Sequence, residues 1–125
     1  MTENEISKIV VEAALKVHKT VGPGLLESAN EECLAYELIK SGLFIEKQKA
    51  LPLVYEEIKL DPGYRVDILV ENKLIIEIKS VEALNDVHLA QILTYLKLSG
   101  CKLGLLINFN VALIKNGIKR VVNQL

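Results

Sequence analysis

Two apolar runs that carry charged residues at alternate positions constrain the fold of this chain more than any other feature. The runs lie within residues 64–80 (YRVDILVENKLIIEIKS), and the polar segment Glu71-Asn72-Lys73 separates them. Their β-branched residues favour strands, and the polar segment predicts the turn of a hairpin. Ionised side chains are rarely buried unless they are paired or bind a metal. The charges in these runs therefore indicate a functional site.

The length of the turn decides which charged residues meet. A two-residue turn would mix charge into both faces of the hairpin, whereas a three-residue loop sets Asp67 opposite Glu77 and keeps one face apolar. That apolar face would consist of Val66, Ile68, Val70, Leu74, Ile76 and Ile78. We therefore predict the three-residue loop, with Asn72 in a left-handed backbone conformation.

Helix signals occur before and after this hairpin. A capping box at Thr2 and apolar residues at helical spacing predict a first helix over about residues 3–19. The segment Gly22-Pro23-Gly24 ends that helix, and a second helix follows it. Asn85 is a suitable N-cap for a third helix over residues 86–99, which Gly100 would end.

The remaining segments indicate further strands of the same sheet. Residues 44–49 and 51–58 are typical of strands interrupted at Pro52, and residues 61–63 (DPG) predict a turn after them. Residues 102–109 form a strongly apolar run, which favours a central strand. The segment from Asn110 onward is a tail that would form either a short strand or a short helix, and its pattern does not decide between them.

Composition narrows the class of protein. The chain of 125 residues is long enough for one domain, which we expect to span residues 1–125, and 50% hydrophobic residues supply its core. The net charge of -1 argues against strong autonomous binding of a polyanion. No apolar run approaches the roughly 20 residues of a membrane span, and residues 1–5 (MTENE) do not resemble a secretory signal. We therefore expect a cytoplasmic protein without a membrane partner.

The facing carboxylates suggest a reaction. Asp67 and Glu77 would repel each other unless a proton or a cation lies between them. Mg²⁺ prefers oxygen ligands and keeps several waters, so two carboxylates and the backbone carbonyl of Ile78 suit it, with Mn²⁺ as the alternative. Lys79 on the same face would orient a water or stabilise developing charge. These residues predict metal-assisted hydrolysis of a phosphodiester.

The same residues resemble the PD-(D/E)XK nuclease superfamily and, within it, the small proteins of the GxxExxY family. The resemblance is carried by residues 22–27 (GPGLLE), Asp67, residues 77–79 (EIK), residues 91–95 (QILTY) and residues 104–110 (GLLINFN). It implies an α/β fold with a mixed sheet, namely a restriction-endonuclease-like αβββαβ core with an extra N-terminal helix. It also implies a nuclease that acts on DNA.

The resemblance further implies roles for individual residues. Asp67 and Glu77 would be metal ligands, Lys79 the catalytic lysine, and Glu27 an additional carboxylate that reaches the same site and also holds the metal. Gln91 and Tyr95 would correspond to a helix feature that lies close to metal or DNA. Two positions depart from the pattern, because Asn30 stands where the GxxExxY family has its tyrosine and Val66 stands where the superfamily has its proline.

Each of these residues also has a purely structural interpretation. Asp67, Glu77 and Lys79 would then form ordinary cross-strand pairs on a solvated face, worth about 0.2 to 1 kcal/mol each. Glu27 would be a first-turn carboxylate that the helix dipole favours. Gln91 and Tyr95 would be a polar boundary residue and an amphipathic core residue.

Three hypotheses about function therefore stay open. The leading one is a Mg²⁺-dependent nuclease. The second is a nuclease-like fold that serves as a binding or assembly module, motivated by the small size, the acidic pI of about 6.1 and Asn30. The third is a hydrolase of nucleotides or small phosphoesters. Because so small a domain has little surface to grip a duplex alone, we also expect a homodimer or a protein partner.

Overall fold

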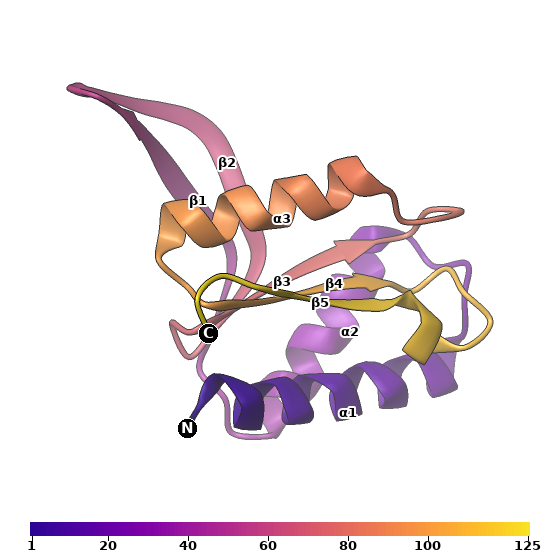
Figure 1. The fold of residues 1–125 in the computed structure, drawn as a ribbon. Coiled ribbons are helices and arrows are strands. Elements are labelled where there is room, and N and C mark those ends of the chain that lie inside the picture. Colours follow the sequence, from indigo (N-terminus) through magenta and orange to yellow (C-terminus); the bar gives the residue numbers. More distant parts are fainter.

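The fold is one mixed sheet with helices on both faces (Figure 1). The computed structural model describes the backbone of the whole chain and the side chains of residues 1–59 and 64–125. In this described part the elements are α1 (Glu3–Val21), α2 (Glu27–Lys40), β1 (Ile45–Tyr55), β2 (Ile58–Val70), β3 (Leu74–Lys79), α3 (Asp86–Ser99), β4 (Leu103–Asn108), the 3-10 helix η1 (Ile114–Gly117) and β5 (Ile118–Val122). The predicted fold class, with two helices, three strands, a helix and a strand in this order, is confirmed.

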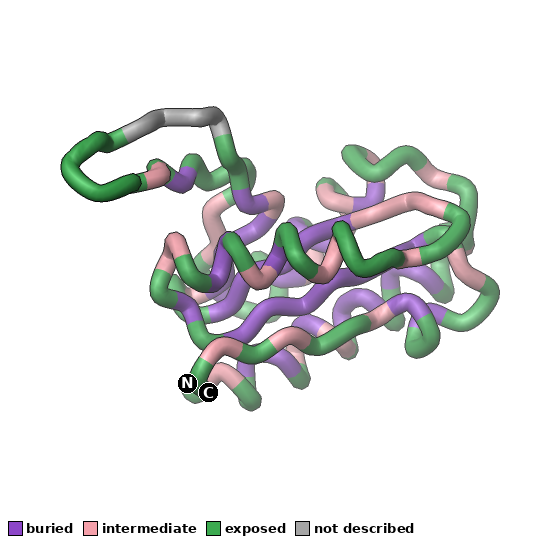
Figure 2. Tube along the Cα trace, turned by 45° about the horizontal axis from the view of Figure 1, so that its top comes forward, coloured by how far each residue is buried: buried purple, intermediate pink, exposed green. Residues whose placement is uncertain are grey.

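The sheet places the hairpin at its centre. Its strand order is β1-β2-β3-β4-β5, in which only β3 and β4 pair in parallel. α3 connects these two parallel strands across one face, and α1 and α2 cover the other face (Figure 1). β3 and β4 are buried along almost their whole length (Figure 2), which agrees with the prediction of a central strand near residues 102–109.

Two separate cores hold the layers together. The first, which we call the α1/α2 core, packs those helices against one face of the sheet and includes Ile68, Val70, Leu74, Ile76 and Ile78 of the hairpin. The second, which we call the α3 core, lies on the other face and includes Leu51, Val66, Leu69, Ile75 and Leu106. Both are almost entirely aliphatic, because the chain contains no Trp and only 5% aromatic residues.

The predicted helix ends are confirmed for α1 and α3. Thr2 accepts a hydrogen bond from the backbone N–H of Glu5, and the Glu5 carboxylate accepts one from the backbone N–H of Thr2. Asn85 caps α3 in the same way, with His88 as its reciprocal partner, and Gly100 ends α3 with φ 77. These caps satisfy N–H groups that the first turn of a helix leaves without partners.

The register of the β2–β3 hairpin is also as predicted. Val70 pairs with Leu74 and Ile68 pairs with Ile76, so the loop contains three residues. Asn72 has φ 55, as expected for a left-handed position, and Glu71 shares this conformation with φ 53. The alternation of apolar side chains therefore sufficed to set the pairing, because a shift by one residue would have turned charged groups into the core.

One expectation about the hairpin is wrong. Val66 was predicted to share a face with Ile68, but Val66 packs in the α3 core and Ile68 in the α1/α2 core. Between the pairs Lys47–Ile68 and Lys49–Val66, β1 contains Gln48, whose φ of 52 is left-handed. A residue in this conformation interrupts the regular pleat locally, much as a β-bulge does. The alternation of side chains between the two faces of the sheet therefore changes between Val66 and Ile68.

The boundary between the first two strands was also predicted wrongly. β1 continues through Pro52, the chain turns at Glu56 and Glu57, and β2 begins at Ile58, so the turn expected at residues 61–63 does not separate the strands. The side chains of residues 61–63 lie outside the described residues. Proline is tolerated in β1 because the register shifts between Leu51 and Leu53, and bulges accommodate it.

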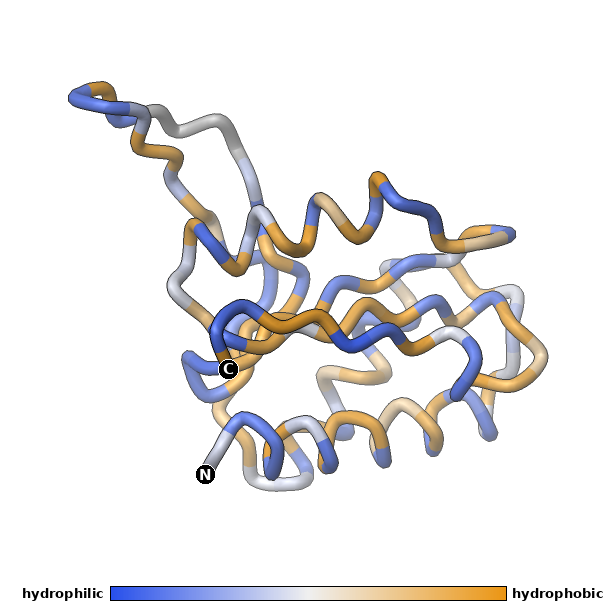
Figure 3. Tube along the Cα trace, viewed as in Figure 1, coloured by the Kyte–Doolittle hydropathy of each residue, from blue (hydrophilic) through white to orange (hydrophobic). Residues whose placement is uncertain are grey.

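The distal parts of β1 and β2 extend beyond the sheet as an arm, Leu51–Lys59 (Figure 1). Apolar residues continue along it toward its tip (Figure 3), where Val54, Tyr55 and Ile58 are exposed. At the C-terminal end of the chain, η1 leads into β5, which pairs with the outer edge of β4 and completes the sheet. No helix in the described part of the chain combines the length and apolar character that a membrane span requires.

Candidate metal centre

The regular pairing of β2 with β3 stops before Asp67 and Glu77. The last ladder pair on this side is Ile68–Ile76. Beyond it, the Glu77 Oε1 atom accepts a hydrogen bond of 3.1 Å from the backbone N–H of Asp67, and the Asp67 Oδ2 atom accepts one of 2.8 Å from the backbone N–H of Ile78. The N–H of Ile78 thus bonds to a carboxylate where a regular ladder would give it a backbone carbonyl of β2, and the ladder does not continue beyond Ile68 and Ile76.

Burial makes Glu77 the most perturbed acid of this group. Its residue surface is only 4% exposed, and it lies opposite Leu106 of β4, whose side chain belongs to the α3 core. Burial first, and then the negative charge of Asp67, raise the pKa of Glu77 to about 8, against the smaller lowering effects of the Asp67 N–H and of Lys79. Without a cation, Glu77 is therefore mostly protonated at pH 7.

The backbone of β3 adds one more oxygen to this group. The carbonyl of Lys79 accepts a hydrogen bond of 3.0 Å from the N–H of Phe109, so Lys79 directs its carbonyl toward the β4 side. Successive residues of a strand direct their backbone groups to opposite neighbours, so Ile78 directs its own toward β2. The hydrogen bond from Ile78 N–H to Asp67 agrees with this direction. The Ile78 carbonyl therefore faces the side on which Asp67 lies.

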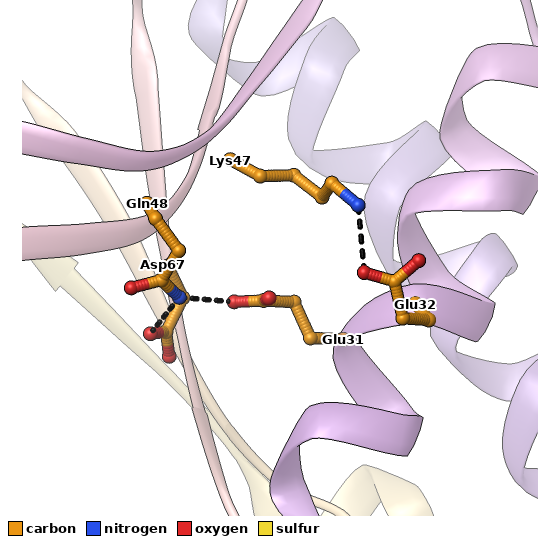
Figure 4. Close-up of polar contacts among 5 residues, drawn as sticks. All are labelled: Glu31, Glu32, Lys47, Gln48 and Asp67. Atoms are coloured by element: carbon orange, nitrogen blue, oxygen red, sulfur yellow. Dashed lines mark hydrogen bonds and ion pairs between the residues drawn. The ribbon is translucent and has the colours of Figure 1, made fainter.

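A pocket opens beside Asp67, on the side of α2. It has a volume of about 300 Å³ and is lined by Glu27, Ser28, Glu31, Gln48, Asp67 and Ile78. The Gln48 Nε2 atom lies 2.7 Å from Glu31 Oε1 and 3.3 Å from Asp67 Oδ1, so one amide group donates to two carboxylates (Figure 4). Burial raises the pKa of Glu31, and the charge of Asp67 adds to this effect, whereas the hydrogen bond from Gln48 lowers it.

Neither Glu31 nor Gln48 was predicted from the sequence as a residue of this site. Glu31 follows Glu27 by four residues, so the two share one face of α2, and this spacing was a signal that could have found Glu31. Gln48 offered no such signal, because its position depends on the pairing of β1 with β2 and on its left-handed backbone.

Glu27 has a partner of its own at the edge of this pocket. Its Oε1 atom accepts a hydrogen bond of 3.0 Å from the backbone N–H of Ser80, and the Ser80 hydroxyl donates one of 2.9 Å to the carbonyl of Leu25. These bonds connect the start of α2 to the end of β3. Glu27 therefore has a structural role here, and it lies on the same pocket as Asp67.

The two predicted α3 residues form a pair on the opposite side. The Gln91 Nε2 atom donates a hydrogen bond of 3.1 Å to the Tyr95 hydroxyl, and Tyr95 is buried. Burial raises the pKa of Tyr95, and the charges of Glu77 and Asp67 raise it further. The Gln91–Tyr95 pair thus lies close enough to these carboxylates to experience their electrostatic potential.

The oxygen atoms at this position fit a small, hard cation. No group of three or more His, Cys, Asp or Glu side chains arranged to hold a metal occurs among the described residues. Asp67, Glu77 and the Ile78 carbonyl instead offer a partial set of oxygens, and Mg²⁺ commonly takes one or two carboxylates and keeps several waters. A cation would also offset the cost of ionising Glu77, whose burial and proximity to Asp67 otherwise favour the protonated form.

Comparison with known proteins supports this chemistry at the level of a superfamily. A family model described as the PD-(D/E)XK nuclease superfamily matches residues 4–121, from α1 into β5. No curated protein and no solved structure matches the chain. The match covers every element that contributes to the carboxylate group, whereas the resemblance to the GxxExxY family stays a prediction.

Proposed function

The chain belongs to the PD-(D/E)XK nuclease superfamily, and we propose that it is a Mg²⁺-dependent nuclease that hydrolyses phosphodiester bonds in DNA. Mn²⁺ is the alternative cation. The observation that carries the proposal is the loss of the β2–β3 ladder at the two carboxylates, which bond to each other's strand through Asp67 N–H and Ile78 N–H. Glu77 is buried and Asp67 is partly buried beside it, and two carboxylates so placed are costly without a compensating group.

The proposal assigns a role to each residue at the open end of the hairpin. Asp67, Glu77 and the Ile78 carbonyl hold the cation. When bound, the cation lowers the pKa of a water and offsets negative charge on the phosphodiester. Lys79, which is half-buried on the same strand face as Glu77, orients the attacking water or stabilises the developing charge.

Residues on the two flanking helices complete the proposed site. Glu27 and Glu31 of α2 line the pocket with Asp67, where they add negative charge that favours a cation. Gln91 and Tyr95 of α3 bind the substrate on the other side, and their mutual hydrogen bond fixes the orientation of both side chains. A homodimer or a protein partner, a cytoplasmic location and membership of the GxxExxY family belong to the same proposal.

Cleavage of labelled DNA by purified variants tests this function. We expect Asp67→Ala and Glu77→Ala to abolish Mg²⁺-dependent cleavage while circular dichroism shows an intact fold. Glu57→Ala is a matched control, because Glu57 is an exposed carboxylate in the turn of the arm, and it should cleave like the wild type. Wild-type cleavage by either Asp67→Ala or Glu77→Ala would disprove the proposed centre.

A second candidate is a nuclease-like module that binds or assembles without cutting. It is favoured by Asn30, which is 1% exposed and whose side-chain oxygen and nitrogen both lack a hydrogen-bond partner. A buried amide without hydrogen-bond partners is costly, so this departure from the family pattern affects the buried face of α2 and not only its exposed face. Calorimetry separates the candidates: no heat of binding with Mg²⁺ or Mn²⁺, together with tight oligomerisation, would favour the module.

The third hypothesis, a hydrolase of mononucleotides or small phosphoesters, uses the same carboxylates. Competition assays separate it from the nuclease. Under the nuclease proposal, a large molar excess of a mononucleotide leaves the cleavage of DNA unchanged, whereas turnover of the mononucleotide itself would favour the small-substrate hydrolase.

A further inference from the structure

Tyr64 is an aromatic residue beside the carboxylates that the proposed mechanism does not use. It lies in β2 opposite Leu51 of β1, at the base of the arm, and 39% of its surface is exposed. Its ring packs against the ring of Tyr95 with a centroid distance of 6.1 Å and an interplanar angle of 54°. One side of the Tyr64 ring is thus supported by α3, while a large part of the residue stays accessible to solvent.

The residue beneath Tyr64 is buried and hydrogen-bonded. Tyr95 is 5% exposed, and its hydroxyl accepts a hydrogen bond from Gln91. The next residue along β2, Arg65, is exposed, and its guanidinium donates a hydrogen bond of 3.4 Å to the carbonyl of Gln48. An accessible aromatic ring that packs against a buried residue is a surface on which proteins stack the bases of single strands.

Tyr64 is also close to the proposed metal centre. It precedes Asp67 by three residues in one strand, which corresponds to about 10 Å along the backbone. The electrostatic surroundings agree, because Glu77, Asp67 and Tyr64 all contribute to the raised pKa of Tyr95. A nucleotide next to a phosphate held at the carboxylates would therefore reach the Tyr64 ring.

We propose that Tyr64 is a stacking platform for an unpaired base, and that the substrate is single-stranded DNA or a frayed DNA end. This inference rests on the proposed nuclease function and specifies its substrate. A base presents its flat face to a tyrosine only when it has left the duplex stack. The net charge of -1 also gives the chain little general attraction for the phosphates of a duplex, so stacking must supply much of the affinity.

Fluorescence of a base analogue tests the stacking directly. The probe is a short oligodeoxynucleotide with 2-aminopurine at one position, used as a single strand and as a blunt duplex, in Ca²⁺ buffer at fixed low salt. The full chain is compared with Tyr64→Phe, which keeps the ring, and with Tyr64→Leu, which keeps an apolar side chain over Tyr95. Thermal unfolding of all three proteins provides the control for folding.

The expected result separates stacking from support. Wild type and Tyr64→Phe quench 2-aminopurine in the single strand and bind it with similar affinity. Tyr64→Leu loses the quenching and binds the single strand about 5- to 100-fold more weakly, a range that corresponds to the loss of one base–aromatic stack. Its affinity for the duplex stays unchanged. A purely structural Tyr64 would alter unfolding without altering the quenching.

The contradicting results are distinct. If Tyr64→Leu quenches and binds like the wild type, or loses single-strand and duplex binding equally, Tyr64 is no stacking platform, and the nuclease proposal stands. If the wild type cleaves no DNA and binds neither probe, the proposed function fails and the stacking role fails with it.

Discussion

The two ends of the β2–β3 hairpin differ although the same two strands build both. At the turn end, three consecutive pairs from Val70–Leu74 to Ile68–Ile76 form a regular antiparallel ladder. At the open end, the N–H groups of Asp67 and Ile78 bond to carboxylate oxygens. The difference shows that stability and the candidate chemistry are separated within one hairpin by a single residue step.

The separation follows from what each end buries. Ile68 and Ile76 have no exposed surface and pack in the α1/α2 core, so the turn end gains from the removal of apolar area from water. Glu77 is almost as deeply buried, but its carboxyl group loses hydration and lies against a second acid. The turn end therefore stabilises the fold and the open end costs stability unless a cation is bound.

The largest expected effect is the loss of cleavage on Asp67→Asn. The amide oxygen of Asn can still accept the hydrogen bond from Ile78 N–H, so the fold should lose at most about 1 kcal/mol. The loss of a charged ligand should reduce Mg²⁺-dependent cleavage by about 10³-fold. Rates measured under single-turnover conditions check this prediction, and a reduction below tenfold would contradict it.

Ile76→Ala should instead reduce stability without reducing cleavage, because it changes the turn end alone. It removes a fully buried side chain from the α1/α2 core, and such truncations cost about 2 to 5 kcal/mol of unfolding free energy. Urea denaturation measures the loss. Below the unfolding transition, the variant should retain its cleavage rate per folded molecule; if the rate falls as far as in Asp67→Asn, the two ends are not separate.

The third prediction concerns pH in metal-free protein. The pKa of Glu77 is about 8 in the folded state, against an ordinary value of 4.5. Its protonation therefore contributes stability that is fully present below about pH 4.5 and is lost as the pH rises through 8. Between pH 5 and 9, the wild type should lose on the order of 3 kcal/mol relative to Glu77→Gln. Denaturation in EDTA at both pH values measures this difference.

Added Mg²⁺ should reverse this pH effect, because the cation favours the ionised carboxylate. A wild type and a Glu77→Gln variant whose stabilities change in parallel with pH would show that Glu77 is not the strained acid of the open end. The same parallel change in the presence of Mg²⁺ would indicate that no cation binds next to it.

The smallest expected effect is at Gln48, whose amide lies between two carboxylates. Gln48→Glu would place a third acid there, so the melting temperature of the metal-free protein should fall. The rise in melting temperature on addition of Mg²⁺ should be larger for this variant than for the wild type. The cost without metal should be about 1 kcal/mol. Glu32→Gln is a matched control, because it only breaks the exposed Lys47–Glu32 pair (Figure 4), and it should change stability by less than about 0.5 kcal/mol.

The parts of the fold that the sequence predicted are those controlled by local signals. The register of β2 and β3 followed from strict alternation, since only one pairing kept charge out of the core. The ends of α3 could be predicted from two residues. The side chain of Asn85 caps the first turn of the helix, and the backbone of Gly100 adopts the left-handed conformation that ends it. The central position of β4 could be predicted from its apolar run, because such a run is typical of a strand that is buried on both faces.

The parts that were missed depend on contacts between distant segments. The separation of the strands at Asp67 involves side-chain bonds to backbone and the left-handed Gln48 of a neighbouring strand. The arm depends on a register shift that accommodates Pro52. β5 is a short edge strand that needs the free edge of β4, and the contact of Tyr64 with Tyr95 joins β2 to α3 at the base of the arm. None of these contacts leaves a periodic pattern in the chain.

The most direct test of the proposed centre is anomalous diffraction from crystals soaked in Mn²⁺. The account predicts one strong peak at the open end of the hairpin, with oxygens of Asp67, Glu77 and the Ile78 carbonyl within about 2 to 2.5 Å. No peak at saturating Mn²⁺, or a peak held by Glu27 and Glu31 without Glu77, would contradict it.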